Sequence, residues 1–207
     1  MRSVTSDETR TGDLRVVPAQ EAPFADVEAV FGTRGDPAHC WCQWYKIPGP
    51  DWRGIGDEAL RDRLAAQLAA PDSGPGLLAY EGDTPVGWCA VEPRSNLVRV
   101  PRTRIITGGT QHPDFDDPSI WAVTCFVIPR AHRRKGVARA LAAAAVEFAR
   151  DHGARVLEGY AVDVSARPGA PAADLFHGTM SMFEKAGFVE VARPRPDRVV
   201  MEHRLGE

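Results

Sequence analysis

The sequence predicts a single α/β domain, in which a mixed central β-sheet is flanked by helices on both faces. Strand-like and helix-like segments follow one another in the order β-α-α-β-β-β-α-β-α-β, and one more strand closes the chain. The 207 residues are 43% hydrophobic and 26% charged, which is typical of a globular protein with one sizeable core. No repeat or linker marks a second domain. We therefore expect residues 13–207 to form one unit behind a disordered, polar tail at residues 1–12.

The first half of the chain contains strands and helices with a clear hydrophobic period. Leu60, Leu64 and Leu68 recur at helical spacing, whereas short apolar runs that end at turn residues indicate strands. The expected elements are a strand at 14–17, helices at 23–31 and 57–70, and a hairpin of strands at 77–80 and 86–91.

A long connection at residues 93–118 follows the hairpin. It begins with Arg94, Arg99, Arg102 and Arg104, and it ends with Asp114, Asp116 and Asp117. Long connections inside compact domains are often functional. A solvated and mobile insertion is the other interpretation, and the sequence leaves both open.

The centre of the chain, residues 123–141, reads as a buried strand, a short basic loop and the start of a helix. The strand is apolar and ends at Pro129, which cannot continue a ladder. Three basic residues then precede Gly136, which allows a tight turn and a close approach to a ligand. Unpaired N–H groups at the helix start favour an anion. The spacing fits neither a Walker loop nor a Rossmann fingerprint. It predicts a pyrophosphate-binding loop, with a solvated basic turn as the alternative.

The last part of the chain returns to the sheet. After the central helix, which Gly153 ends, the expected elements are a strand at 156–162, a loop at 164–171, a helix at 172–186, and a closing hairpin of strands at 188–191 and 199–203.

The central segment resembles the acetyl-CoA-binding motif of the GNAT acetyltransferase superfamily, in which a strand ending in V-x-P is followed by R-x-x-G-x-A and a helix. A second segment at 182–188, Met-Phe-Glu-Lys-Ala-Gly-Phe, resembles that family's last helix, which ends in an aromatic residue and then A/L-G-F. The two motifs have the family's order and separation, and the resemblance covers residues 13–205. It implies a GNAT-like single domain and an N-acetyltransferase of a bacterial type.

The resemblance also implies how the coenzyme is held. Acetyl-CoA would be the cosubstrate, and its acetyl group would pass directly to a primary amine of a small molecule or peptide. The pantetheine arm and the acetyl carbonyl would bind the backbone of Cys125, Phe126 and Val127. The pyrophosphate would bind the backbone of Arg133, Arg134, Lys135, Gly136, Val137 and Ala138.

The sequence departs from the family at the positions that handle protons. Trp121 stands where many members carry a catalytic Glu, Phe183 where they carry a Tyr, and Phe176 where they often carry an Asn. Glu158 or His177 could replace the base, and Tyr160, on the same side of its strand as Glu158, could replace the acid. Further candidates for the base are Glu92 and Asp163. These departures also allow a second hypothesis, a non-catalytic acyl-CoA-binding regulatory module.

A cluster of aromatic and thiol side chains at residues 39–45 has three interpretations. The aromatic residues Trp41, Trp44 and Tyr45, with Trp121, could line the acceptor pocket, because such pockets are mostly apolar. They could instead be core. A metal site at Cys40 and Cys42 is not expected, since Cys-x-Cys lacks the usual ligand spacing.

Charge and targeting signals exclude other classes. The net charge of −3 does not favour nucleic-acid or membrane binding. The first residues lack the apolar region of a signal peptide, and four cysteines without an export signal indicate a reducing, cytoplasmic location. The resemblance adds a homodimer paired through the closing strands as an expectation. The acceptor amine stays unidentified.

Overall fold

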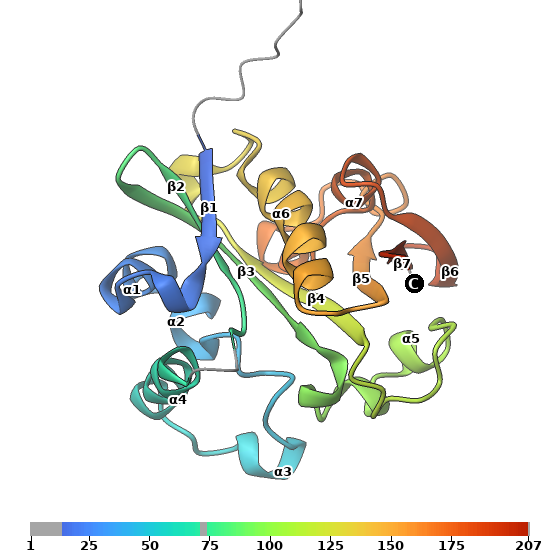
Figure 1. The fold of residues 1–207 in the computed structure, drawn as a ribbon, viewed down its shortest axis with the longest axis horizontal. Coiled ribbons are helices and arrows are strands. Elements are labelled where there is room, and N and C mark those ends of the chain that lie inside the picture. The colour runs from blue at the N-terminus through green and yellow to red at the C-terminus, as the bar shows by residue number, and fades with distance from the viewer. Residues whose placement is uncertain (1–13, 71–73, 207) are drawn as a thin grey trace, which may run out of the picture.

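The structure, a computed structural model, describes residues 14–70 and 74–206 (Figure 1). The tail expected at residues 1–12 lies outside this part. In the described ranges, no helix combines the length and the apolar character needed to cross a membrane.

A mixed seven-stranded sheet forms the centre of the domain, with the strand order β1-β2-β3-β4-β5-β7-β6. The pairing of β4 with β5 is parallel and the other pairings are antiparallel. The strands are β1 (Leu14–Pro18), β2 (Leu77–Glu81), β3 (Thr84–Pro93), β4 (Ile120–Val127), β5 (Val156–Val162), β6 (Val189–Arg195) and β7 (Arg198–Arg204).

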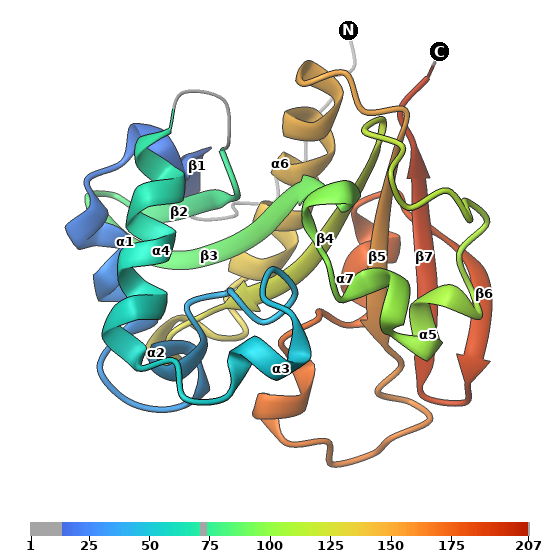
Figure 2. The same cartoon turned by 90° about the horizontal axis from the view of Figure 1, so that it is seen from below.

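Helices cover both faces of this sheet, as predicted. On one face, α6 and α7 pack over a large apolar core. On the other face, α1 and α4 cover a second core over β2 and β3, and Figure 2 shows these two helices side by side there. The helices are α1 (Phe24–Phe31), α2 (Asp36–Cys40), α3 (Gly49–Trp52), α4 (Asp57–Ala69), α5 (Arg104–Thr107), α6 (Val137–Asp151) and α7 (Met180–Lys185).

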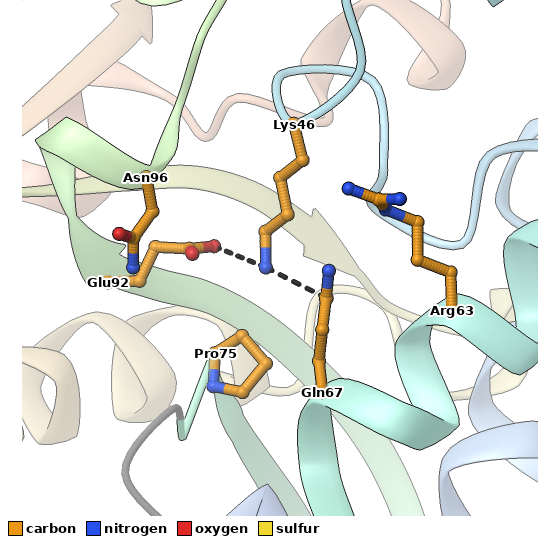
Figure 3. Close-up of a pocket in the computed structure, with 6 residues that line it drawn as sticks. All are labelled: Lys46, Arg63, Gln67, Pro75, Glu92 and Asn96. Atoms are coloured by element: carbon orange, nitrogen blue, oxygen red, sulfur yellow. Dashed lines mark hydrogen bonds and ion pairs between the residues drawn. The ribbon is translucent and has the colours of Figure 1, made fainter. Parts of the chain in front are cut away.

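The long connection at 94–118 is packed against the sheet and contains short helical turns. Leu97, Val100 and Ile106 are buried in a third core with residues of β4, β5 and β7. This part of the chain is therefore a cover for one end of the sheet and not a solvated insertion. Between α4 and the end of β3, the packing leaves a polar cavity (Figure 3).

The predicted helix at 172–186 is wrong in its first half. A short 3-10 turn at Ala172–Leu175 is followed by an extended segment, and α7 begins only at Met180. Gly178 adopts a φ of +88°, a left-handed conformation that glycine takes readily and a helix cannot use. The backbone of this segment bonds to the sheet in place of a helix.

Candidate active site

Strand β4 changes its pairing in the middle, and this change creates the candidate site. Its register with β3 shifts so that Ala90 lies opposite Cys125 and Val91 opposite Val123. Thr124 is therefore the extra residue of a β-bulge. On the other side, β4 pairs with β5 only from Ile120 to Val123. Beyond that point the two strands separate, so the last residues of β4 form no ladder hydrogen bonds with β5. We call residues 124–127 and 160–162 the divergent ends.

The three β4 residues predicted to hold the coenzyme lie in this divergent end. Phe126 points toward α7, where its ring lies 5.9 Å from that of Phe183. Cys125 and Val127 point to the opposite face, toward α1 and α4. The bulge at Thr124 sets this alternation. The expected contacts with the coenzyme use backbone groups of β4 that face β5. In this part of β4, those groups form no ladder with β5.

The predicted phosphate loop joins β4 to α6. Gly136 is the residue before the helix and has a φ of +84°. The first bond along α6 runs from the Ala140 N–H to the Gly136 carbonyl, so the N–H groups of Val137 and Ala138 have no acceptor within the helix. Arg133 donates to the carbonyl of Ile128 at 3.0 Å, which fixes the loop against the end of β4. A helix start of this kind, with a basic loop in front, suits a pyrophosphate.

The segment from Phe176 to Gly178 lies between the divergent ends and bonds to both. The Phe126 N–H donates to the Phe176 carbonyl at 2.6 Å, and the Val162 N–H donates to the Gly178 carbonyl at 2.9 Å. The His177 ring lies between them, with Nδ1 at 3.1 Å from the carbonyl oxygen of the bulge residue Thr124. One of the backbone N–H groups predicted to bind the pantetheine arm and the acetyl carbonyl, that of Phe126, therefore already has an acceptor.

His177 has a defined tautomer at this position. A carbonyl oxygen only accepts hydrogen bonds, so Nδ1 carries the hydrogen and Nε2 keeps a free lone pair. Burial and the charge of Arg198 lower the pKa of His177 to about 4, against a weaker upward effect of its bond to Thr124. The ring is therefore neutral at pH 7. Tyr45, whose pKa is raised by its burial, lies with its ring centroid 6.0 Å from that of His177.

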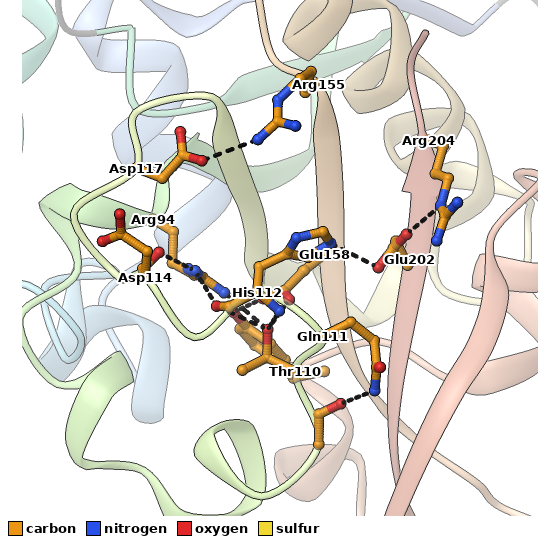
Figure 4. Close-up of polar contacts among 12 residues, drawn as sticks. Arg94, Thr110, Gln111, His112, Asp114, Asp117, Arg155, Glu158, Glu202 and Arg204 are labelled. Atoms are coloured by element: carbon orange, nitrogen blue, oxygen red, sulfur yellow. Dashed lines mark hydrogen bonds and ion pairs between the residues drawn. The ribbon is translucent and has the colours of Figure 1, made fainter. Parts of the chain in front are cut away.

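Glu158 and Tyr160 are buried and belong to a different network. Figure 4 shows Glu158 in this network, close to Arg94 and Thr110. The Glu158 carboxylate accepts hydrogen bonds from Arg94 at 3.1 Å, from Tyr160 at 2.8 Å, and from Thr110. Arg94 also donates to the backbone carbonyls of His112 and Asp114. Burial and the Glu158 charge raise the pKa of Tyr160. Through these contacts, Glu158 and Tyr160 help to hold the long connection against the sheet. The proton-transfer roles suggested for the two residues stay predictions, and none of these contacts supports them.

The four aromatic residues predicted for the acceptor pocket do not come together. Trp41 stacks on Phe31 at 4.9 Å in the core, and Trp44 is 42% exposed. Trp121 packs on Phe148 of α6, on the opposite face of the sheet. Side chains alternate between the two faces along β4, so Trp121 and its neighbour Ala122 point to opposite faces. Only Tyr45 lies beside the divergent ends.

Some residues of the site carried no signal in the sequence. The bulge at Thr124 depends on the pairing of two strands, which single-chain periodicity does not show. The sequence identifies Arg94 only as part of a basic segment. Strand alternation correctly places Glu158 and Tyr160 on one face of the sheet. Glu92 and Glu202 lie on the same line across the strands, with Glu92 opposite Ala122 and Glu202 opposite Glu158.

The comparisons with known proteins identify the family to which the chain belongs. The profile described as the acetyltransferase (GNAT) family matches residues 41–188. The chain therefore belongs to the GNAT acetyltransferase family, and acetyl-group transfer from acetyl-CoA is the chemistry of that family. A search of curated protein sequences found no match.

Solved structures share the fold at low sequence identity. The protein yncA from Salmonella typhimurium, solved with its cofactor acetyl-CoA, has a TM-score of 0.55 and 16% identity over 94% of this chain and 95% of its own. The PaiA N-acetyltransferase from Thermoplasma acidophilum, in complex with coenzyme A, has a TM-score of 0.52 and 12% identity over 93% of this chain and 99% of its own. An N-acetyltransferase from Staphylococcus aureus Mu50 has a TM-score of 0.51 and 10% identity over 93% and 99%.

The described residues fit one part of acetyl-CoA as they stand and another part only after a movement. The left-handed Gly136 and the free N–H groups at the start of α6 suit its pyrophosphate. The Phe126 N–H fits a thioester carbonyl only after the Phe176 carbonyl has left it.

Proposed function

We propose that the protein transfers an acetyl group from acetyl-CoA to a primary amine of a small molecule or peptide. The observation that carries this proposal is the bulged β4, which leaves β5 and leads into the Gly136 loop and α6. This arrangement supports a thioester between the divergent ends and a pyrophosphate at the helix start. Acetyl-CoA would have to reach both positions at once, because its pantetheine arm joins the thioester to the pyrophosphate.

The roles of the residues follow from their contacts. The Phe126 N–H would donate to the acetyl carbonyl oxygen and stabilise the negative charge that develops there. The Nε2 atom of neutral His177 would accept a proton from the amine. Because a pKa of about 4 makes this imidazole a weak base, an acceptor whose amine is already partly neutral at pH 7 is favoured. An α-amino group, with a pKa near 8, meets this condition better than a lysine side chain.

The test is a calorimetric titration with acetyl-CoA, followed by a thiol-release assay on amines. The amine panel contrasts peptides with a free α-amino group and peptides with only a free lysine side chain. Binding followed by thiol release with one amine class supports the proposal. Absence of acetyl-CoA binding would overturn it.

A non-catalytic acyl-CoA-binding module is the second candidate, and one observation favours it. Phe183, at the place of the family's tyrosine, is fully buried between Phe126 and Phe188, so it offers no acid for the thiolate. Binding of acetyl-CoA without thiol release from any amine would favour this alternative.

A further inference from the structure

A polar cavity lies between α4 and the end of β3, away from the divergent ends. Its volume is about 140 Å³, which gives room for on the order of ten water-sized atoms. This size admits a metabolite fragment but not the nucleotide of coenzyme A. The lining residues are Lys46, Arg63, Gln67, Pro75, Glu92 and Asn96.

The inner wall of this cavity is a buried ion pair. The Lys46 ammonium lies 2.8 Å from the Glu92 carboxylate, and their side chains are only 8% and 4% exposed. Lys46 also donates to Gln67 at 3.0 Å, and Gln67 exchanges hydrogen bonds with the buried Gln43. An ammonium has three donors, and Glu92 and Gln67 account for two of them. The polar wall is thus held in place from several sides.

The outer wall adds a second positive charge. Arg63 comes from the exposed side of α4 and lines the cavity. Figure 3 shows its guanidinium beyond Lys46 and Gln67, away from Glu92. The neighbouring Arg61 is paired with Glu28 and Asp62, whereas no ion pair to Arg63 is formed within residues 14–70 and 74–206. Two cations and one carboxylate leave the lining with a positive charge of one. The amides of Gln67 and Asn96 add neutral hydrogen-bonding groups.

We propose that this cavity binds a small molecule through a carboxylate group. The Arg63 guanidinium offers the planar pair of donors that matches a carboxylate, and the third donor of Lys46 offers a further contact. A ligand carboxylate neutralises the remaining positive charge of the lining, whereas a neutral or cationic ligand does not.

The cavity is distinct from the proposed transfer site. Lys46 and Tyr45 are adjacent in the chain, yet Lys46 faces Glu92 on β3 whereas Tyr45 faces His177. The lining of the cavity includes neither Tyr45 nor Thr124, which lie beside His177. This inference therefore does not depend on the proposed function.

N-acetylglycine and N-acetylglycinamide form a matched pair of probes for this cavity. They have the same number of non-hydrogen atoms and differ only in the carboxylate, and neither has a free amine that could be acetylated. Calorimetric titration of the full chain should show N-acetylglycine binding in the millimolar range and N-acetylglycinamide binding at least about tenfold more weakly. Equal binding of the two probes, or no binding of either, would overturn the proposal.

Variants of Arg63 place the binding in this cavity. Arg63→Gln should weaken N-acetylglycine binding by about tenfold or more, since a charged hydrogen-bond partner is lost. Arg63→Lys should recover part of the affinity. Arg34→Gln, at an exposed arginine before α2, is the control and should bind like the wild type.

Arg63 is the suitable site because Lys46→Met would leave Glu92 buried without its partner and would destabilise the fold. Acetyl-CoA affinity should be the same in all these proteins. Unchanged N-acetylglycine affinity in folded Arg63→Gln would show that the probe binds elsewhere and would reject the assignment.

Discussion

The Arg94 guanidinium donates to the Glu158 carboxylate at 3.1 Å, and neither side chain is exposed. This pair joins the first turn of the long connection to β5, the strand beside the candidate site. The other donors of Arg94 hold the carbonyls of His112 and Asp114. A single guanidinium thus fixes both ends of the cover over one end of the sheet.

Replacing Arg94 should therefore destabilise the domain strongly. Arg94→Met leaves the Glu158 carboxylate buried without its cation, and we expect the free energy of unfolding to fall by about 3–5 kcal/mol. Urea unfolding followed by circular dichroism measures this loss. The exposed Arg102→Met should change stability by less than about 0.5 kcal/mol. Equal effects of the two substitutions would contradict the anchor role of Arg94.

A carboxylate at Gly136 should abolish acetyl-CoA binding. Gly136→Asp places a negative charge where the pyrophosphate is expected, at a residue with a φ of +84°. Gly153→Asp is the matched control, because Gly153 has a φ of +80° at the other end of α6 and open space around it. Both variants bear a similar backbone strain. Calorimetry should show lost binding only for Gly136→Asp, and acetyl-CoA affinity retained in that folded variant would reject the phosphate-loop assignment.

His177 should give the protein a pH-dependent stability in the acidic range. Its pKa of about 4 in the folded state lies below the value of about 6.5 expected when unfolded. Between these values the unfolded chain binds the extra proton, so stability falls as the pH drops. We expect a loss of about 2 kcal/mol from this group between pH 7.5 and pH 5.

Comparison with His177→Asn isolates this effect, because other titrating groups contribute to both proteins. Urea unfolding at the two pH values should give a smaller loss for the variant. The same loss in both proteins would show that His177 is not held neutral by the fold.

Two tryptophans that are three residues apart should respond differently to truncation. Trp41 is buried against Phe31, and Trp41→Ala should lower the free energy of unfolding by about 3–5 kcal/mol. Trp44 is 42% exposed, although it stacks on Arg99 with the guanidinium 3.8 Å from its ring centroid. Trp44→Ala should cost about 1 kcal/mol or less. Thermal unfolding of the two variants tests this, and a similar cost for both would contradict the different environments.

The fold could be predicted from the sequence where the pattern is local. The period of Leu60, Leu64 and Leu68 is enough to place α4, and the apolar run before Pro129 is enough to place β4. The Gly136 loop also lies within one short stretch of chain. These signals need no partner strand to be recognised.

The helix predicted at 172–186 crosses the break before α7, although a local signal marks that break. Gly178 and Thr179 together mark a helix start, because glycine weakens a helix interior and threonine is a favoured N-terminal cap. The bulge at Thr124 and the pair of Lys46 with Glu92 had no such signal. Both depend on segments that the fold brings together from distant parts of the sequence.

The contact between Phe126 and Phe176 has a consequence for the rate at which acetyl-CoA is taken up. An N–H group donates well to one acceptor at a time, so in the proposed role of Phe126 the Phe176 carbonyl would compete with the thioester for its N–H. Only molecules in which the Phe176 carbonyl has turned away from the Phe126 N–H can form the full complex, and the apparent affinity is reduced by their fraction. In a stopped-flow experiment, the observed rate of complex formation should then level off at high acetyl-CoA concentration, at the rate with which that carbonyl turns away.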